Sequence, residues 1–313
     1  MNLDSIADLF IEVDRLAEST VLSNNVLSQN VNEEVLKGIL DKLSTLEMEV
    51  GKDRFITYEG TIFRAHLGCT KTGKQYSLRR VPSFRPSLDK ENKEGIKFPS
   101  YFPRTVQKQL KQTGGLYLVT GPLGSGKSTT AAALLNYMLT LTGGVARTLE
   151  DPPEYDLQGK YGDNGICWQH EVEGGDFAPL IRSMMRSFPS GVPSYMLLGE
   201  IRDQNTAQEA LRAMLNGTSV LATIHGEDIQ SSVLRFLNLC GNGAYVRESL
   251  GKMLRLLINQ HKIVTLSGAS EVKFTTLEGG NDLNAILSQE KTHSIRDLVT
   301  LQNNARIGES RGK

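Results

Sequence analysis

The sequence predicts an α/β fold in which helices flank a mainly parallel sheet, preceded by a smaller α+β domain. Two observations carry this expectation. From about residue 104 onward, apolar runs typical of buried strands alternate with segments of helical periodicity, as crossover connections in a parallel sheet require. Within that region, a glycine-rich turn at 121–126 joins a strand-like run to a helix-like run.

The first part of the chain has a different pattern. Residues 4–16 and 33–48 place apolar side chains at helical spacing, which predicts two amphipathic helices. Residues 54–81 hold stretches rich in β-branched and aromatic side chains, separated by the turn-like sequence Lys-Thr-Gly-Lys, and this predicts strands. We therefore expect a small domain of mixed helix and strand.

A linker is expected between the two domains. Residues 82–103 hold four of the ten prolines, and the segment 89–94 is densely charged, a composition typical of linkers. We place the amino-terminal domain with its linker at residues 1–97 and the larger domain at 98–313.

The larger domain is expected to contain strands at 116–120, 145–149, 195–198 and 219–224. A helix over 129–139 should follow the glycine-rich turn. A second helix should run over 205–216, with Asp203 as its cap and Gly217 at its end. After about residue 250 the pattern indicates only mixed helix and strand.

Bulk properties argue against several classes of protein. The 313 residues balance 35 basic against 35 acidic side chains, so no global field draws the chain to nucleic acid or anionic lipid. No apolar run is long enough to span a bilayer, and the amino terminus does not resemble a signal peptide. Cys69, Cys167 and Cys240 are widely spaced, which argues against a structural zinc site and fits a reducing cytosol.

Residues 121–128 read Gly-Pro-Leu-Gly-Ser-Gly-Lys-Ser and fit the phosphate-binding pattern G-x-x-x-x-G-K-[ST]. Glycines let the backbone approach phosphate oxygens, and successive N–H groups at a helix N-terminus attract the anion. Lys127 should reach the β- and γ-phosphates of ATP, and the Ser128 hydroxyl should coordinate Mg²⁺. The expected nucleotide-binding residues are Gly121, Gly124, Ser125, Gly126, Lys127, Ser128 and Thr129.

Three carboxylates follow the expected strand at 145–149, where open α/β sheets bind ligands. Glu150 and Asp151, with Ser128, are expected to hold Mg²⁺, partly through water. Glu154 belongs to the same segment. An acidic turn before a proline pair is the alternative interpretation.

The strand at 195–198 also runs into an acidic segment. Gly199 stands where many phosphate-loop proteins keep a metal-binding aspartate, and Glu200 remains as general base or water-orienting residue. Asp203 is interpreted mainly as the cap of the next helix. His225 follows the strand at 219–224 and is a candidate sensor of the γ-phosphate; a structural role is the alternative.

These segments together resemble the PilT/GspE-like traffic ATPases of secretion and type IV pilus machines. The likeness rests on four segments in order, namely GPLGSGKSTT at 121–130, TLEDPPEY at 148–155, LLGEIRD at 197–203 and ATIHGEDIQSSVLRFL at 222–237. The resemblance covers residues 104–260 best. It implies a RecA-like P-loop ATPase domain preceded by a PAS-like domain.

The resemblance also implies functional residues and an assembly. Arg64 and either Arg79 or Arg80 match arginines that approach the phosphates when the domains close, although solvation at a strand edge is the other interpretation. Glu154 becomes a second candidate for handling the catalytic water, and Arg202 matches an arginine of the third segment. The family implies a homohexameric ring that uses ATP and Mg²⁺ at the cytoplasmic face of the inner membrane, with membrane and cytoplasmic machine components as partners.

Departures from the family pattern favour one branch. The stretch 282–290 matches poorly the carboxyl-terminal motif of retraction motors, and three cysteines cannot supply the four-cysteine zinc motif of many pilus-assembly members. The resemblance then favours the branch of type IVB secretion and conjugation. A nucleic-acid translocating ATPase and a non-hydrolysing nucleotide-binding regulator are the competing interpretations, but no direct nucleic-acid binding is expected.

Overall fold

The computed structural model describes residues 3, 6–23, 26–29, 31–51, 53–82, 84–88, 96–264 and 270–311. The chain divides into two compact units: the first comprises residues 1–84 and 154–156, and the second comprises residues 85–153 and 157–313. The expected domain boundary between residues 97 and 98 stays a prediction. The charged segment 89–94 lies outside the described residues.

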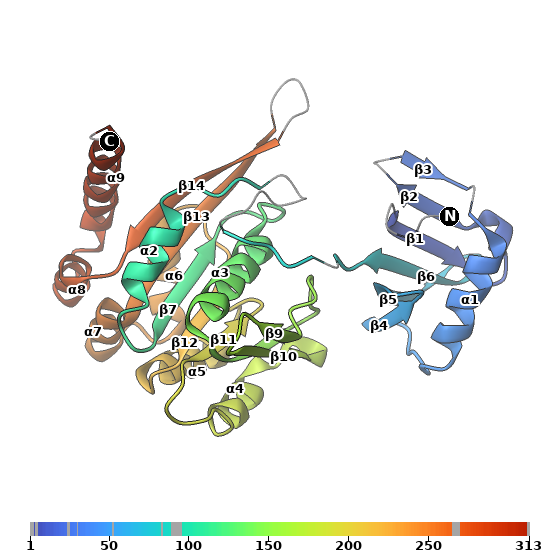
Figure 1. Ribbon diagram of the computed structural model, residues 1–313, viewed down its shortest axis with the longest axis horizontal. Coiled ribbons are helices and arrows are strands. Elements are labelled where there is room, and N and C mark those ends of the chain that lie inside the picture. The colour runs from blue at the N-terminus through green and yellow to red at the C-terminus, as the bar shows by residue number, and fades with distance from the viewer. Residues whose placement is uncertain are drawn as a thin grey trace. The chain divides into compact units, whose positions relative to one another are not determined.

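The described part of the first unit is built on an antiparallel sheet that packs with helix α1, Glu33–Ser44 (Figure 1). In spatial order its strands are β3 (Val26–Ser28), β2 (Thr20–Ser23), β1 (Ile6–Glu12), β6 (Gly73–Arg80), β5 (Thr61–Thr70) and β4 (Asp53–Tyr58). Helix α1 begins at Asn32, whose side chain accepts hydrogen bonds from the Glu34 and Val35 N–H groups. Its buried side chains join the core of this unit, so the helix expected at 33–48 and the strands expected within 54–81 are confirmed.

The helix expected at residues 4–16 is wrong, because the residues there form strand β1. Ile6, Leu9 and Ile11 are its buried side chains. The pairing of β1 with β2 shifts register between Ile6 and Asp8. Such an irregularity inserts a residue into the alternation of a strand, so the inward positions 6 and 9 acquire the three-residue spacing of a helix.

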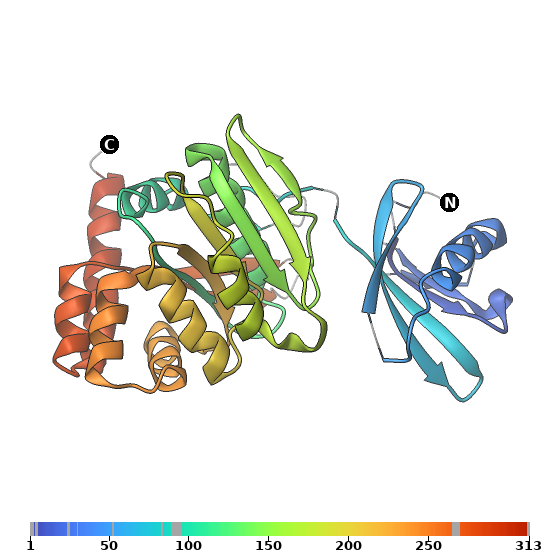
Figure 2. The ribbon, with the colours of Figure 1, turned by 90° about the horizontal axis from the view of Figure 1, so that it is seen from below.

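The second unit is built on an eight-stranded sheet (Figures 1 and 2). In spatial order its strands are β14 (Ser270–Glu278), β13 (Leu254–Val264), β7 (Gly115–Thr120), β12 (Ser219–Ile224), β11 (Ser194–Leu198), β8 (Gly144–Glu150), β10 (Gly165–Glu171) and β9 (Gly159–Tyr161). The six inner strands are parallel, and only β14 and β9 at the edges are antiparallel to their neighbours. The four strands expected from the sequence are therefore confirmed.

Helices cover both faces of this sheet (Figure 2). The helices are α2 (Phe102–Gln109), α3 (Lys127–Thr142), α4 (Phe177–Met185), α5 (Gln204–Leu215), α6 (Ile229–Leu239), α7 (Ala244–Met253), α8 (Asn281–Ser288) and α9 (Ile295–Arg311). Helices α2 and α3 pack together on one face of the sheet. The crossover through α3 moves along the sheet from β7 to β8, whereas the crossovers through α4, α5 and α6 move in the opposite direction. Because such crossovers are right-handed, α4, α5 and α6 cover the other face. This is the RecA-like P-loop arrangement that the resemblance implies. Among the described residues, the structure holds no helix with the length and hydropathy needed to cross a membrane.

The fold brings several chain segments to one edge of the sheet. Strands β7, β8, β11 and β12 are parallel neighbours, so their carboxyl ends meet at the same edge. Such an edge is where open α/β sheets bind ligands.

Candidate functional site

The phosphate loop lies between β7 and α3, and its glycines adopt left-handed backbone conformations. Gly121, Gly124 and Gly126 have φ of 148°, 73° and 88°. A Cβ at Gly121 would lie 2.2 Å from the carbonyl oxygen of Gln260, and one at Gly126 would lie 2.7 Å from a methyl carbon of Ile96. The loop therefore fits tightly against β13 at one position, while nothing lies within 4 Å of a Cβ at Gly124.

This contrast predicts unequal effects of two equivalent substitutions. Gly121→Ala should destabilise the protein by about 2–5 kcal/mol, because a backbone clash adds to the cost of a left-handed alanine. Gly124→Ala meets only the conformational cost, about 1–2 kcal/mol. Chemical unfolding of the two variants measures the difference; equal losses would contradict the packing described for Gly121.

Helix α3 places the remaining loop residues. Lys127 begins the helix and is buried, with 8% of its surface exposed, and its Nζ donates to the carbonyl oxygens of Gly121 at 3.0 Å and Pro122 at 2.9 Å. Ser128 is half-buried and Thr129 is buried in the same first turn. The Oγ of Ser125 is buried without a hydrogen-bond partner among the described residues. Orphaned donors at a helix N-terminus are suited to an anion such as a triphosphate.

Sequence reasoning missed Gln260 of β13, the strand beside β7. Its side chain is fully buried, and Nε2 donates to the carbonyl oxygen of Ser125 at 2.5 Å. The same Nε2 lies 3.3 Å from the place that a Cβ would take at Gly126. Gln260 therefore hydrogen-bonds the loop at Ser125 and leaves little room for a side chain at Gly121 or Gly126. The two consecutive amides Asn259 and Gln260, directly after the apolar run 256–258, are the sequence signal that could have indicated it.

We expect Gln260→Met to weaken ATP binding about tenfold while changing the free energy of unfolding by less than about 1 kcal/mol. The variant leaves the Ser125 carbonyl oxygen unpaired, but it also removes Oε1 of Gln260, which has no partner among the described residues. These two effects on stability oppose each other. Nucleotide titration and chemical unfolding measure the two quantities, and wild-type affinity would show that the loop does not depend on this bond.

Glu200, Arg202 and His225 form a cluster beyond the ends of β11 and β12. Glu200 is the most buried, with 13% of its side chain exposed. Its Oε2 accepts from Nε of Arg202 at 2.6 Å. Its Oε1 lies 3.0 Å from Nε2 of His225, at ion-pair distance but outside hydrogen-bond alignment. The structure thus brings together two residues predicted from separate motifs, and the carboxylate is largely shielded from solvent.

The position of Gly199 is explained by its neighbour on β8. Its N–H donates to the Leu149 carbonyl oxygen at 2.8 Å, and a Cβ at residue 199 would lie 3.3 Å from the Glu150 Cα. Glu150 is buried, and its Oε1 accepts from Gln169 at 2.8 Å. A larger side chain at Gly199 would press on Glu150, so the carboxylate at this point of the sheet comes from β8.

The donor set fits Mg²⁺ in part. Mg²⁺ in phosphate-transfer sites keeps several waters and uses one or two protein oxygens besides the phosphates. Ser128 and Glu150 offer such oxygens, whereas Asp151 is exposed. Glu154 is also exposed and belongs to the first compact unit.

A second network fixes the loop that follows His225. A Cβ at Gly226 would lie 2.1 Å from the Ser232 Oγ, which itself lies 2.8 Å from the Thr120 Oγ1 at the end of β7. From β13, the Asn259 side chain donates to the Glu227 carbonyl oxygen at 3.2 Å, and His261 Nε2 lies 2.9 Å from the same oxygen. Strand β13 therefore contacts both the phosphate loop and the loop that follows His225.

Asp203 caps α5, as expected. Its side chain accepts from the Thr206 N–H at 2.9 Å and from the Thr206 hydroxyl at 2.7 Å. Burial raises the pKa of Asp203, but the hydrogen bonds from Thr206 and from the backbone N–H groups of Asn205 and Asp203 together outweigh burial and hold the pKa below its usual value. Gly217 follows the end of the helix with φ of 90°.

The three predicted arginines of the first unit do not share one face of its sheet. Arg64 and Arg79 are direct cross-strand partners. Arg79 is exposed, and its Nε donates to Asp8 at 2.8 Å, while Arg64 lies 3.7 Å from Asp53. Arg80 instead pairs with the buried Phe63 and donates to the Ile6 carbonyl oxygen. Of these three arginines, only Arg64 and Arg79 therefore lie side by side on the same face of the sheet.

Comparisons with known proteins agree with this architecture. A twitching motility protein from Neisseria gonorrhoeae is 34% identical over 214 residues, which are 67% of this chain and 53% of that protein. The chain thus spans about half the length of this relative. The crystal structure of the pilus retraction motor PilT with bound ADP has a TM-score of 0.77 at 23% identity, covering 95% of this chain and 86% of that one.

A second solved structure, the Legionella pneumophila ATPase DotB, has a TM-score of 0.71 at 22% identity and covers 95% of this chain and 84% of its own. At these identities the structural likeness concerns the fold. A family model described as type II/IV secretion system protein matches residues 58–302. The chain therefore belongs to the type II/IV secretion system protein family.

Proposed function

We propose that this chain is a Mg²⁺-dependent ATPase that powers a secretion or type IV pilus machine. One observation carries the proposal: a phosphate loop after β7 and a shielded glutamate after β11 lie at the same edge of one sheet, in a member of this family. The first supplies an anion cradle, and the second supplies a group that orients water. Together they meet the requirements of phosphoryl transfer to water.

In the proposed mechanism, Lys127 exchanges its loop carbonyl partners for the β- and γ-phosphate oxygens and neutralises charge that develops there. Glu200 orients or deprotonates the attacking water in line with the γ-phosphate. His225 lies 3.0 Å from Glu200, so a change at that carboxylate during hydrolysis is passed through His225 to the loop that follows it. Ser128, with Glu150 and Asp151, would hold Mg²⁺, which would supply further charge neutralisation.

The arginines of the first unit have a separate role in this proposal. Arg64 and Arg79, on one face of the sheet, stabilise negative charge on the phosphates when the units close on nucleotide. Glu154 assists with the water. Arg80 has a structural role, because its guanidinium donates to the backbone of β1.

We further propose that six copies form a ring at the cytoplasmic face of the inner membrane. Its partners are components of a type IVB secretion, conjugation or pilus machine. The family and the names of the relatives support a machine of this kind, and the poor retraction motif at 282–290 favours the secretion and conjugation branch. The balanced charge of the chain gives no support to direct nucleic-acid binding.

The test uses the purified chain. ATP hydrolysis with Mg²⁺ and assembly size in a non-hydrolysable ATP analogue are measured, and the corresponding gene is deleted in the host. Loss of effector export, plasmid transfer or twitching then identifies the machine. No measurable affinity for adenine nucleotides in the presence of Mg²⁺ would overturn the proposal.

A further inference from the structure

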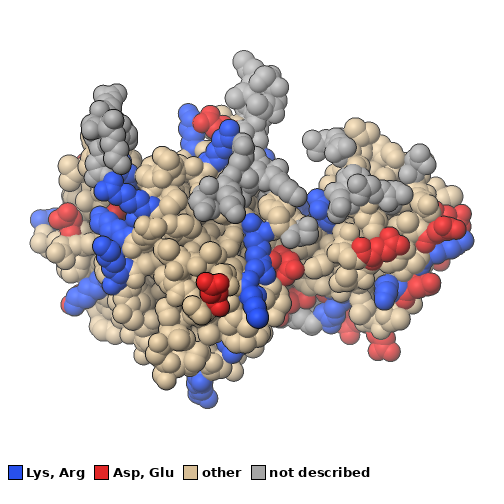
Figure 3. Space-filling view, in the orientation of Figure 1, with Lys and Arg blue, Asp and Glu red and all other residues tan. Residues whose placement is uncertain are grey.

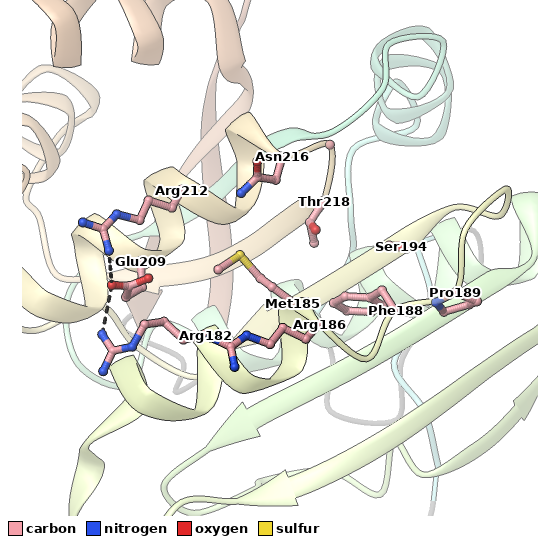
Figure 4. A pocket seen from close by; sticks show the side chains of 11 residues that line it. Arg182, Met185, Arg186, Phe188, Pro189, Ser194, Glu209, Arg212, Asn216 and Thr218 are labelled. Atoms are coloured by element: carbon pink, nitrogen blue, oxygen red, sulfur yellow. Dashed lines mark hydrogen bonds and ion pairs between the residues drawn. The ribbon is translucent and has the colours of Figure 1, made fainter.

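A basic pocket of about 560 Å³ lies in the second unit between α4 and α5 (Figure 4). Three arginines line its walls. Arg182 belongs to α4, Arg186 directly follows that helix, and Arg212 belongs to α5. Ser194 and Thr218, at the amino ends of β11 and β12, also line it. The pocket is therefore at the edge of the sheet opposite to the carboxyl ends that carry Glu200 and His225.

The charge of the pocket is only partly balanced. Glu209, 4% exposed, accepts through Oε1 from Arg182 at 3.0 Å and from Arg212 at 2.7 Å, as the dashed lines in Figure 4 show. Arg186 is exposed, and its side chain has no ion-pair or hydrogen-bond partner among the described residues. Three guanidinium groups and one carboxylate thus line the pocket, and the surplus of positive charge favours an anionic occupant.

The same pocket has an apolar wall. Met185 and Phe188 line the pocket, are partly buried and pack against the core of the unit. Figure 4 shows Met185 directed toward the space between α4 and α5 and Phe188 beyond the carboxyl end of α4. A ligand suited to both features carries carboxylates and apolar side chains within a short length. Free phosphate supplies only the charge.

One described segment of this chain has that chemistry. Residues 46–50 read Leu-Glu-Met-Glu-Val and follow the end of α1. Leu46 and Val50 are 37% and 55% exposed, and Glu47 and Glu49 are exposed between them. None of the ion pairs among the described residues includes either glutamate.

The two compact units also carry opposite formal charges. The first holds 14 acidic and 10 basic side chains, a net charge of −4, and the second holds 21 acidic and 25 basic, a net charge of +4. On the face in Figure 3, acidic side chains form several groups over the first unit. Opposite net charges favour the approach of the first unit of one copy to the second unit of another.

We propose that the pocket of one copy receives the segment 46–50 of a second copy, with Glu47 and Glu49 paired to the arginines and Leu46 or Val50 against the Met185–Phe188 wall. This inference rests on the proposed self-assembly and names the surfaces that carry it. The contact joins different surfaces of the two copies, so repetition generates a ring or an open chain.

The test reverses charges on each side and then on both. Arg186→Glu, and separately Glu47→Arg with Glu49→Arg, should each weaken self-association at least about tenfold in sedimentation velocity at low salt, because like charges then meet. The combination of all three substitutions should restore association. Half-molar salt should shrink the effects, because the Debye length falls to about 4 Å. Nucleotide affinity should stay at the wild-type value throughout.

Matched controls separate this contact from general charge effects. Arg235→Glu changes an exposed arginine of α6, and Glu59→Arg changes an exposed glutamate whose φ of 47° matches the 44° of Glu47. Neither should alter association. If the wild type assembles and the reversals change nothing, or if only Arg186→Glu weakens assembly, the segment is not the occupant while the proposed ring stands. If the wild type stays monomeric with nucleotide, both proposals fail.

Discussion

Lys127→Ala should abolish ATP turnover, with a fall in kcat of at least about a thousandfold. The Lys127 ammonium is buried beside the loop carbonyl oxygens, and in the proposed mechanism it neutralises charge on the transferred phosphate. In a shielded site such a charge contributes much more than it would in water. Steady-state release of phosphate at saturating ATP measures the effect.

Two controls accompany this variant. Lys111→Ala removes an exposed lysine of the same unit and should leave turnover unchanged. Thermal unfolding of Lys127→Ala checks that the variant folds, since the substitution removes the Lys127 hydrogen bonds to the carbonyl oxygens of Gly121 and Pro122. A folded Lys127→Ala with wild-type turnover would exclude the loop from catalysis.

Glu200→Gln should retain ATP binding and lose hydrolysis by about 10²–10⁴-fold. The amide keeps the shape of the side chain but cannot accept a proton from water, and it removes the negative charge that Arg202 and His225 face. Equilibrium binding of a fluorescent ATP analogue and single-turnover hydrolysis separate the two steps.

The matched control is Glu227→Gln. Glu227 is exposed in the adjacent loop and contacts β13 through its backbone carbonyl oxygen, so loss of its charge should not alter turnover. Equal losses in the two variants would indicate a general electrostatic effect in place of a specific role for Glu200. Wild-type hydrolysis in Glu200→Gln would remove it from the catalytic role.

Much of the second unit could be predicted from local pattern. Runs rich in apolar side chains mark β7, β8, β11 and β12, because parallel strands covered on both faces bury nearly every side chain; only Arg147 of β8 and Ser194 of β11 are half-buried. The amino-terminal strand β1 could not be predicted in this way. Its register irregularity changes the spacing of inward residues, and only the neighbouring strands β2 and β6 determine that the segment is extended.

The candidate site likewise has residues that local pattern predicts and one that it does not. The phosphate loop, Glu200 and His225 follow strands and carry recognisable residue types, so the sequence indicates each of them. Gln260 lies more than 130 residues from Ser125, with which it shares a hydrogen bond, and no local pattern relates the two. Its role depends on β13 pairing with β7, which is a property of the complete sheet.

The adjacent arginines at the end of β6 illustrate how strand geometry divides a doublet. Successive side chains of an extended chain project to opposite sides, so an anion that approaches the sheet from either side meets one guanidinium of the two. Arg79→Ala should then remove an exposed ion pair with Asp8, whereas Arg80→Ala should remove the hydrogen bond to the Ile6 carbonyl oxygen of β1. Two adjacent arginines, identical in the sequence, thus have different roles in the folded protein.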